Sequence, residues 1–140
     1  MLSVYPACFF KEDTGYSVIF PDLDRLSTCG DTLEESLEMA VDCLAGYLYT
    51  LKKDGETAPK ASPMDKIDLK AIADDLEISA EGSFVNMITV DVNEYAKTHF
   101  EKSVKKTLTI PAWLNEAAQE HHINFSKVLQ DALKAELRVR

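Results

Sequence analysis

The sequence predicts an α+β protein with two parts, a larger N-terminal domain with a sheet and one long helix, and a small strand-helix-helix domain at the C-terminal end. Three observations favour this fold class. Short segments of alternating hydrophobicity fill the first thirty residues, a helical pattern follows from residue 33, and alternation returns at residue 104 ahead of two further helical patterns. The 140 residues, 46% of them hydrophobic, can bury a core without disulfides or metals.

Three strands are predicted within the first thirty residues. Residues 2–10 carry apolar side chains of both parities, so this strand is expected to be central in the sheet. The polar loop 11–15 ends in glycine, which is typical of a hairpin, and residues 16–20 then alternate until a proline ends the strand. A short third strand is expected over residues 25–29, because Gly30 interrupts the pattern there.

The longest helix is predicted from about Leu33 to Leu51. Thr32 and Glu35 have the spacing of a capping box, in which each side chain satisfies a backbone N–H at the start of the helix. Apolar side chains, beginning with Leu33, recur behind this box at helical spacing and form one stripe. Asp54-Gly55 is expected to end the helix.

Residues 55–82 give the weakest pattern. Their prolines discourage regular structure, and their apolar residues indicate a broken helix or a strap. These apolar residues are Ile67, Leu69, Ile72 and Leu76. Beyond this segment, β-branched and apolar residues predict a fourth strand over residues 83–91, and a short helix is expected over residues 93–100.

The pattern restarts in the last forty residues. Residues 104–110 alternate as a strand, and Pro111 closes it at a favourable first-turn position for a helix. Asn124 is a good N-cap for a last helix with one apolar side. A single strand cannot form a sheet alone, so two such strands from two chains are expected to pair antiparallel. The tail therefore implies a homodimer, with room for a higher assembly.

This ribbon would present Lys105, Thr107 and Thr109 on one face. A two-stranded ribbon fits the major groove of double-stranded DNA, where lysine binds guanine and threonine hydroxyls bind several base edges. The start of the last helix, Phe125-Ser126-Lys127, offers free N–H groups to a phosphate. The tail is therefore expected to bind DNA, and the alternative is a strand and helix pair that only dimerises.

Two runs of the tail resemble a ribbon-helix-helix DNA-binding domain. One is Lys105-Lys-Thr-Leu-Thr-Ile-Pro-Ala-Trp-Leu, and the other is Ile123-Asn-Phe-Ser-Lys-Val-Leu-Gln-Asp-Ala-Leu. The resemblance implies base contacts from the outward strand residues and phosphate contacts from Asn124, Phe125 and Ser126. The turn between the helices departs from the family pattern, because it carries His121 and His122 where glycine is common. Lys106 has the inward parity and is expected to extend out to solvent.

The net charge of −9 hides a difference between the two parts. Residues 1–99 carry 19 acidic and 8 basic side chains, a net of −11, whereas residues 100–140 carry 5 acidic and 7 basic, a net of +2. Charge asymmetry of this kind indicates two segments with different partners. We therefore divide the chain into an acidic domain over residues 1–99, a linker over 100–103, and a tail domain over 104–140.

The acidic domain resembles the HicB antitoxin family. The resemblance rests on Tyr5, on Gly15-Tyr16-Ser-Val-Ile-Phe-Pro21-Asp22, and on Gly30-Asp31-Thr32-Leu-Glu34-Glu35 followed by Ala40. It implies a partial RNase H-like β-β-β-α-β fold and a partner, a small basic HicA-type toxin that cleaves mRNA with a histidine. It also implies an antitoxin that covers this toxin, represses its own operon by binding operator DNA, and is not an enzyme.

An acidic surface can compete for the basic surface with which a toxin grips RNA. The candidate toxin-binding residues are Tyr16, Asp22, Asp24, Asp31, Glu34 and Glu35. Helix capping also explains Thr32 and Glu35, and the helix dipole explains Asp31 and Glu34. Two other functions stay open, a transcriptional regulator with a ligand-sensing domain and a metal-dependent nuclease that uses clustered carboxylates.

The remaining features point to a cytoplasmic protein without a cofactor or metal. No apolar run reaches the roughly 18 residues of a membrane span, and the N-terminus lacks the pattern of a secretory signal. Cys8, Cys29 and Cys43 have no CxxC spacing and are expected to be buried, reduced thiols. Trp113 is expected at a helix start, where it packs against other residues. The adjacent His121 and His122 point too far apart to chelate one metal.

Overall fold

A computed structural model describes all 140 residues. The chain divides into two compact units, Met1–Lys102 and Ser103–Arg140, which we call the body and the tail. Each unit is described by itself. No helix of either unit is both long enough and apolar enough to cross a bilayer.

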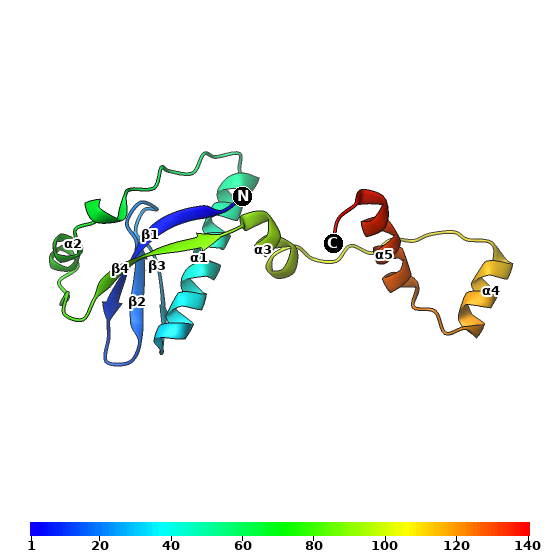
Figure 1. The fold of residues 1–140 in the computed structure, drawn as a ribbon, viewed down its shortest axis with the longest axis horizontal. Helices are drawn as coiled ribbons and strands as arrows, with labels where there is room; N and C mark the ends of the chain where they lie inside the picture. The colour runs from blue at the N-terminus through cyan, green and yellow to red at the C-terminus, as the bar shows by residue number, and fades with distance from the viewer. The chain divides into compact units, whose positions relative to one another are not determined.

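The body contains one antiparallel sheet of four strands in the order β3-β2-β1-β4 (Figure 1). The strands are β1 (Ser3–Lys11), β2 (Tyr16–Phe20), β3 (Leu26–Gly30) and β4 (Phe84–Val90). The predicted α+β class is confirmed, as are the four strands to within one or two residues. β1 is flanked by β2 on one side and β4 on the other, which explains its apolar side chains of both parities.

Helix α1 (Leu33–Lys53) begins at the predicted N-cap, Thr32, but the return hydrogen bond to Glu35 comes from the residue before it. Thr32 Oγ1 accepts a hydrogen bond of 3.1 Å from the Glu35 N–H, and Glu35 Oε2 accepts one of 2.8 Å from the Asp31 N–H. In a standard box the glutamate would accept from the N-cap residue itself. Leu33, assigned from spacing to the apolar stripe, is 39% exposed instead.

The main core lies between α1 and one face of the sheet. Phe9, Val18 and Phe20 of the strands and Ala40 and Leu44 of the helix are completely buried there. Burial of apolar surface stabilises a fold by about 25 cal/mol per Å², so this core is the dominant stabilising contribution to the body. Gly30 permits the close approach of α1, since a Cβ at this position would lie 2.5 Å from the Ser36 nitrogen.

The later part of the segment 55–82, from Ile67 to Ala80, covers the other face of the sheet, while Ala61 packs against the main core. The 3₁₀ helix η1 (Met64–Lys66) and helix α2 (Leu69–Asp75) lie along this segment, and its apolar residues pack on a second cluster around Cys8, Phe10 and Ile19. Figure 1 shows α1 and α2 on opposite sides of the strands. The segment that the sequence indicated as a broken helix or a strap is thus both, and it buries the second face of the sheet.

Helix α3 (Val92–His99) follows β4 and packs on α1. The Asp91 carboxylate caps it by accepting from the Glu94 N–H at 3.2 Å. The Tyr95 hydroxyl donates a 2.9 Å hydrogen bond to Asp42 on α1. Burial, with this hydrogen bond as the second cause, raises the pKa of Tyr95 to about 12.

The tail contains helices α4 (Ala112–Glu120) and α5 (Phe125–Leu137). The strand predicted over residues 104–110 is not present in the single chain, because a strand needs a partner for its backbone groups and the tail provides none. Pro111 precedes α4 as its N-cap instead of occupying the first turn. No residue from Ser103 to Arg140 is buried, and Trp113, which was expected to pack, is 70% exposed.

The turn between α4 and α5 accommodates the two histidines. His121 ends α4, and His122 adopts a left-handed conformation with φ of 52°, the region that favours glycine. Asn124 then caps α5 as predicted, since its Oδ1 accepts a 3.0 Å hydrogen bond from the Lys127 N–H.

Candidate functional site

The predicted acidic group of the body is divided into two by strand β3. Asp22 and Asp24 precede the strand, and Asp31 follows it with Glu34 and Glu35 in the first turn of α1. Because a strand rises about 3.3 Å per residue, the two parts lie roughly 20 Å apart. The carboxylates therefore bracket one edge of the sheet and do not form a single cluster.

Two of the predicted residues have interior contacts. Both oxygens of Asp22 accept hydrogen bonds from Ser62, from its N–H at 2.8 Å and its hydroxyl at 2.6 Å, which fasten the segment after α1 to the end of β2. Tyr16 is half-buried against the rings of Phe9 and Phe84, with centroids 6.4 Å and 5.5 Å away. These contacts hold both side chains in place within the body.

The other acidic side chains are exposed. Glu35 is held by the cap, and Asp24 accepts only a long contact of 3.4 Å from the Tyr47 hydroxyl. Asp31, Glu34 and Asp24 form no ion pair. These three carboxylates are free to meet a basic surface.

The same region holds two exposed apolar residues that sequence reasoning did not assign to a surface. Leu33 and Met39, on the first turns of α1, are 39% and 38% exposed beside the carboxylates. The signal was ambiguous, because a leucine at helical spacing is typical of a core position. Leu33 and Met39 lie six residues apart and point about 120° away from each other on the helix, so they do not form one apolar patch.

The tail separates its two parities as predicted. Lys105, Thr107 and Thr109 are exposed, while the even-numbered residues of the same segment line an apolar groove of about 680 Å³ together with α4 and α5. The groove is lined by Lys106, Leu108, Ile110, Leu114, Asn115, Ala118, Ile123, Phe125, Ser126, Val128, Leu129 and Ala132. The tail thus has one polar side and one open apolar side.

The predicted phosphate-binding residues lie at the start of α5, between these two sides. Asn124 uses its side-chain oxygen for the cap, and the Lys127 Nζ lies 3.5 Å from Asp131. Phe125, at 45% exposure, and Ser126 both line the apolar groove. The backbone N–H groups of this first turn, more than the side chain of Phe125, are the chemical feature that suits an anion.

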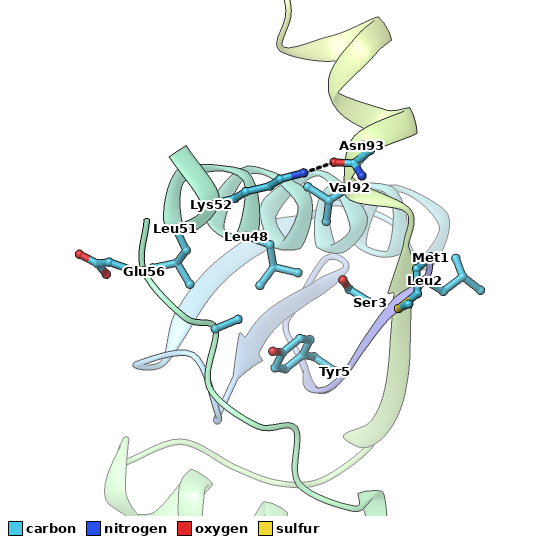
Figure 2. A pocket seen from close by; sticks show the side chains of 11 residues that line it. Met1, Leu2, Ser3, Tyr5, Leu48, Leu51, Lys52, Glu56, Val92 and Asn93 are labelled. Atoms are coloured by element: carbon cyan, nitrogen blue, oxygen red, sulfur yellow. Dashed lines mark hydrogen bonds between the residues drawn. The ribbon is translucent and has the colours of Figure 1, made fainter. Parts of the chain in front are cut away.

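A cleft of about 380 Å³ lies in the body between the start of β1, the end of α1 and the start of α3, and Figure 2 shows the side chains that line it. Leu48, Leu51 and Val92 form its apolar wall, and the Lys52 Nζ donates a 2.6 Å hydrogen bond to Asn93 at its rim. The Tyr5 hydroxyl is already bound to the Pro59 carbonyl. A ligand-sensing role would use this cleft, although its lining lacks a convergent set of free polar groups.

Titratable and metal-binding groups do not gather elsewhere. Burial raises the pKa of the Cys8 thiol to about 11, so it is an unreactive core residue. The expectation that all three cysteines are buried is wrong for two of them, since Cys43 is half-buried and Cys29 is exposed. Cys29 lies on β3, which contributes no residue to the second core cluster. No group of three or more His, Cys, Asp or Glu side chains has the geometry to hold a metal ion.

Comparisons with known proteins agree across both units. A family model described as the HicB-like antitoxin of a bacterial toxin–antitoxin system matches residues 5–133. A chain of a toxin–antitoxin complex from Streptococcus pneumoniae shares the fold with a TM-score of 0.63 and 32% identity, over 97% of this chain and 99% of that one.

Two curated relatives cover less of the sequence. An uncharacterised 14.9 kDa protein of Haemophilus phage HP1 is 29% identical over 112 residues, which are 79% of this chain and 75% of the phage protein. Antitoxin HicB 2 of Photorhabdus laumondii is 50% identical over 58 residues, 41% of this chain and 42% of that antitoxin.

These matches place the chain among the antitoxins of bacterial toxin–antitoxin systems. Within that class, the chain belongs to the HicB-like antitoxin family.

Proposed function

We propose that this antitoxin binds a small basic HicA-type toxin directly through its body, which blocks cleavage of mRNA, and that it represses its own operon by binding operator DNA as a dimer through its tail. The protein acts by occupying surfaces and not by catalysis. The body corresponds to a partial RNase H-like fold and the tail to a ribbon-helix-helix domain. The observation that carries the proposal is the separation of an acidic, self-contained body from a mildly basic tail with an open apolar groove.

Charge and exposure support the toxin-binding part. The body has a net charge of −11, and Asp24, Asp31 and Glu34 have no cationic partner within the chain. An RNA-cleaving toxin needs a basic surface for its substrate, so the body attracts that surface and accelerates encounter. The structural relative from Streptococcus pneumoniae is itself part of a toxin–antitoxin complex.

The apolar groove supports the dimer. Leu108, Val128 and Leu133 are more than half exposed in the single chain, and the tail buries no residue. A patch of this size costs solubility unless a second surface covers it. A second tail supplies the missing strand and covers both grooves, because the two-fold arrangement brings the same face of each chain together.

The polar parity of the tail supports operator recognition. Antiparallel pairing of two segments 104–110 would present Lys105, Thr107 and Thr109 from each chain to the major groove. The first turn of α5, with Asn124, Ser126 and Lys127, would contact the phosphates that flank the ribbon. Because the tail has a net charge of only +2, we expect base contacts and dimerisation to contribute more than bulk charge.

Substitution of the ribbon tests the DNA-binding part. Lys105→Ala with Thr107→Ala should weaken operator binding by about 1–3 kcal/mol per lost base contact, while toxin binding is unchanged. Lys134→Ala, which removes one exposed charge on α5 far from the ribbon, is the matched control. A double variant that shifts operator DNA at the wild-type concentration would show that the tail does not read the bases.

Neutralisation of the free carboxylates tests the toxin-binding part. Asp31→Asn with Glu34→Gln should weaken toxin binding by about 0.2–1 kcal/mol per exposed pair, mainly through slower association at low salt. Asp13→Asn with Glu77→Gln removes the same charge from other exposed positions and controls for net charge. Equal effects of the two variants on the association rate would reject the specific surface and leave only general attraction.

A further inference from the structure

The outer edge of β3 carries unpaired backbone groups. β3 lies at one end of the sheet and pairs only with β2. In an antiparallel pair, hydrogen-bonded and non-hydrogen-bonded positions alternate along each strand. Every second residue of an edge strand therefore points its N–H and C=O away from the sheet, where a further strand can bind them.

The register identifies these residues. The Glu12 N–H donates to the Gly15 carbonyl at the β1–β2 turn, so the odd-numbered residues of β2 bond to β1. The even-numbered residues of β2 then bond to β3, and each lies opposite an even-numbered residue there, for example Val18 opposite Thr28. The odd-numbered residues of β3 point outward.

The outward residues are Ser27 and Cys29, and both are exposed. The one hydrogen bond that engages their outward groups is long, 3.8 Å from the Cys43 thiol on α1 to the Ser27 carbonyl. The next N–H in the same row, that of Asp31, already donates to Glu35 in the cap of α1. The open row therefore consists of two N–H and two C=O groups.

A row of partly exposed side chains on α1 runs beside this edge. Met39, Cys43 and Tyr47 follow each other at intervals of four residues, so they share one side of the helix. The Cys43 thiol reaches β3, and the Tyr47 hydroxyl lies 3.4 Å from Asp24, just before the strand. Met39 is exposed and the other two are half-buried, so a strand added to β3 would cover this row with alternate side chains.

The charges around the edge select the partner. Asp24 lies at one end, Asp31 and Glu34 lie at the other, and none of them forms an ion pair. Arg25, the cation next to Asp24, is already paired with Asp75 of α2. A second β3 would be repelled, because antiparallel pairing about a two-fold axis brings Asp24 of one copy close to Asp31 of the other. A basic segment is attracted at both ends.

We propose that the edge of β3 binds an extended, basic segment of the toxin as a fifth strand of the sheet. This inference rests on the proposed function, since it states how the body holds its toxin. Ser27 and Cys29 supply four backbone hydrogen bonds, and the pattern of alternate side chains gives the specificity. The two groups of carboxylates, roughly 20 Å apart, bind lysine or arginine near the two ends of the segment.

Hydrogen exchange of single amides tests the edge directly. The full chain is measured alone and in complex with the small basic toxin of the same operon. In the free chain, the Ser27 and Cys29 N–H groups should exchange fast, while that of Thr28, which is bonded to β2, is protected. In the complex, exchange of the two outward amides should slow by at least about tenfold.

A proline at Cys29 removes one outward donor. Proline is tolerated on an edge strand where its nitrogen faces solvent, so Cys29→Pro should stay folded and bind the toxin at least about tenfold more weakly. Thr89→Pro removes an outward N–H from β4, the other edge strand, and is the matched control. Cys29→Val retains the N–H and should recover most of the lost affinity. Ser27→Pro repeats the test at the second outward residue, and circular dichroism melting verifies folding.

Three results would overturn the proposal. The outward amides exchange equally fast in the free chain and in a complex that forms, or Cys29→Pro and Ser27→Pro both bind as tightly as Thr89→Pro. The third result is protection of these amides in the free chain that fades on dilution, which would assign the edge to a second copy. Each of them leaves the proposed function intact, because the toxin is then bound elsewhere on the body. A wild-type chain that forms no complex would instead reject the proposed function and this inference together.

Discussion

The body and the tail begin their helices in the same way and are stabilised in different ways. Thr32 caps α1 and Asn124 caps α5, each by accepting a hydrogen bond of 3.0–3.1 Å from the N–H three residues later. Yet Leu44 of α1 is completely buried, while none of α5 is. Local capping thus specifies where a helix starts, but only the body supplies the surface that makes its helix stable in a single chain.

This difference teaches that the two units respond differently to concentration. Folding of the body is a property of one chain. Folding of the tail, in the arrangement we propose, is coupled to association, so its stability contains a mass-action contribution that the body lacks. Four experiments can break or sharpen this comparison, and they are given in order of decreasing effect.

The largest effect is expected from Leu108→Lys with Ile110→Lys. Two charges on the apolar side of the tail should prevent association and melt α4 and α5, because isolated helices of 9 and 13 residues are marginal in water. Hydrogen exchange should show protection lost over residues 112–137 and retained over α1. Unchanged protection in α5 would mean that the tail folds as a single chain.

A cavity in the body should cost about 2–5 kcal/mol, as expected for Leu44→Ala at a completely buried site. The loss should be the same at low and high protein concentration in urea unfolding. Leu129→Ala in the tail is the matched substitution, and its cost should depend on concentration. Concentration dependence for both variants would erase the distinction between the units.

The two caps should be equivalent. Thr32→Ala and Asn124→Ala each remove one hydrogen bond at a helix start and should cost about 0.5–2 kcal/mol. Thr32→Ala should lower the stability of the body, and Asn124→Ala should lower that of the tail. Hydrogen exchange of the amides in α1 and α5 measures the free energy of opening of each helix. A cap effect transmitted to the other unit would show that the two units unfold together.

The smallest effect concerns Tyr95, which packs α3 on α1. Its pKa is raised to about 12 by burial and by the hydrogen bond to Asp42, so the neutral phenol contributes stability below pH 10 that is lost as the pH rises through 12. Tyr95→Phe should lower the free energy of unfolding by about 0.5–1.5 kcal/mol at neutral pH. Between pH 10 and 12 the free energy of unfolding of this variant should fall less steeply with pH than that of the wild type. Tyr49→Phe is the control, and an unchanged alkaline slope in Tyr95→Phe would contradict the assignment.

Local patterns were enough to predict most of the body. Alternation gave the strands, and the Thr32–Glu35 spacing gave the start of α1, because both signals depend on neighbouring residues only. The role of residues 55–82 could not be predicted from the sequence. It depends on Cys8, Phe10 and Ile19, which are far away in sequence and form the second apolar face of the sheet. The exposure of Leu33 could not be predicted either, because helical spacing alone does not report which apolar side chains meet the sheet.

The candidate sites show the same difference between features that local sequence patterns predict and features that depend on distant residues. Parity alone separated Lys105, Thr107 and Thr109 from the groove, because period-two alternation is a local property. The acidic group of the body was treated as one cluster, although β3 separates Asp24 from Asp31. The hydrogen bond between Asp22 and Ser62 could not be predicted, because it joins residues forty positions apart and no local pattern reports such a contact.

The uncovered groove of the tail also has a consequence for gene control. If the DNA-reading ribbon exists only when two chains meet, the number of ribbons at low abundance grows with the square of the number of chains. Halving the antitoxin would then remove about three quarters of its repressing species, as mass action for a dimer requires. An apolar surface left open in one molecule would in this way turn a linear loss of protein into a sharper return of transcription.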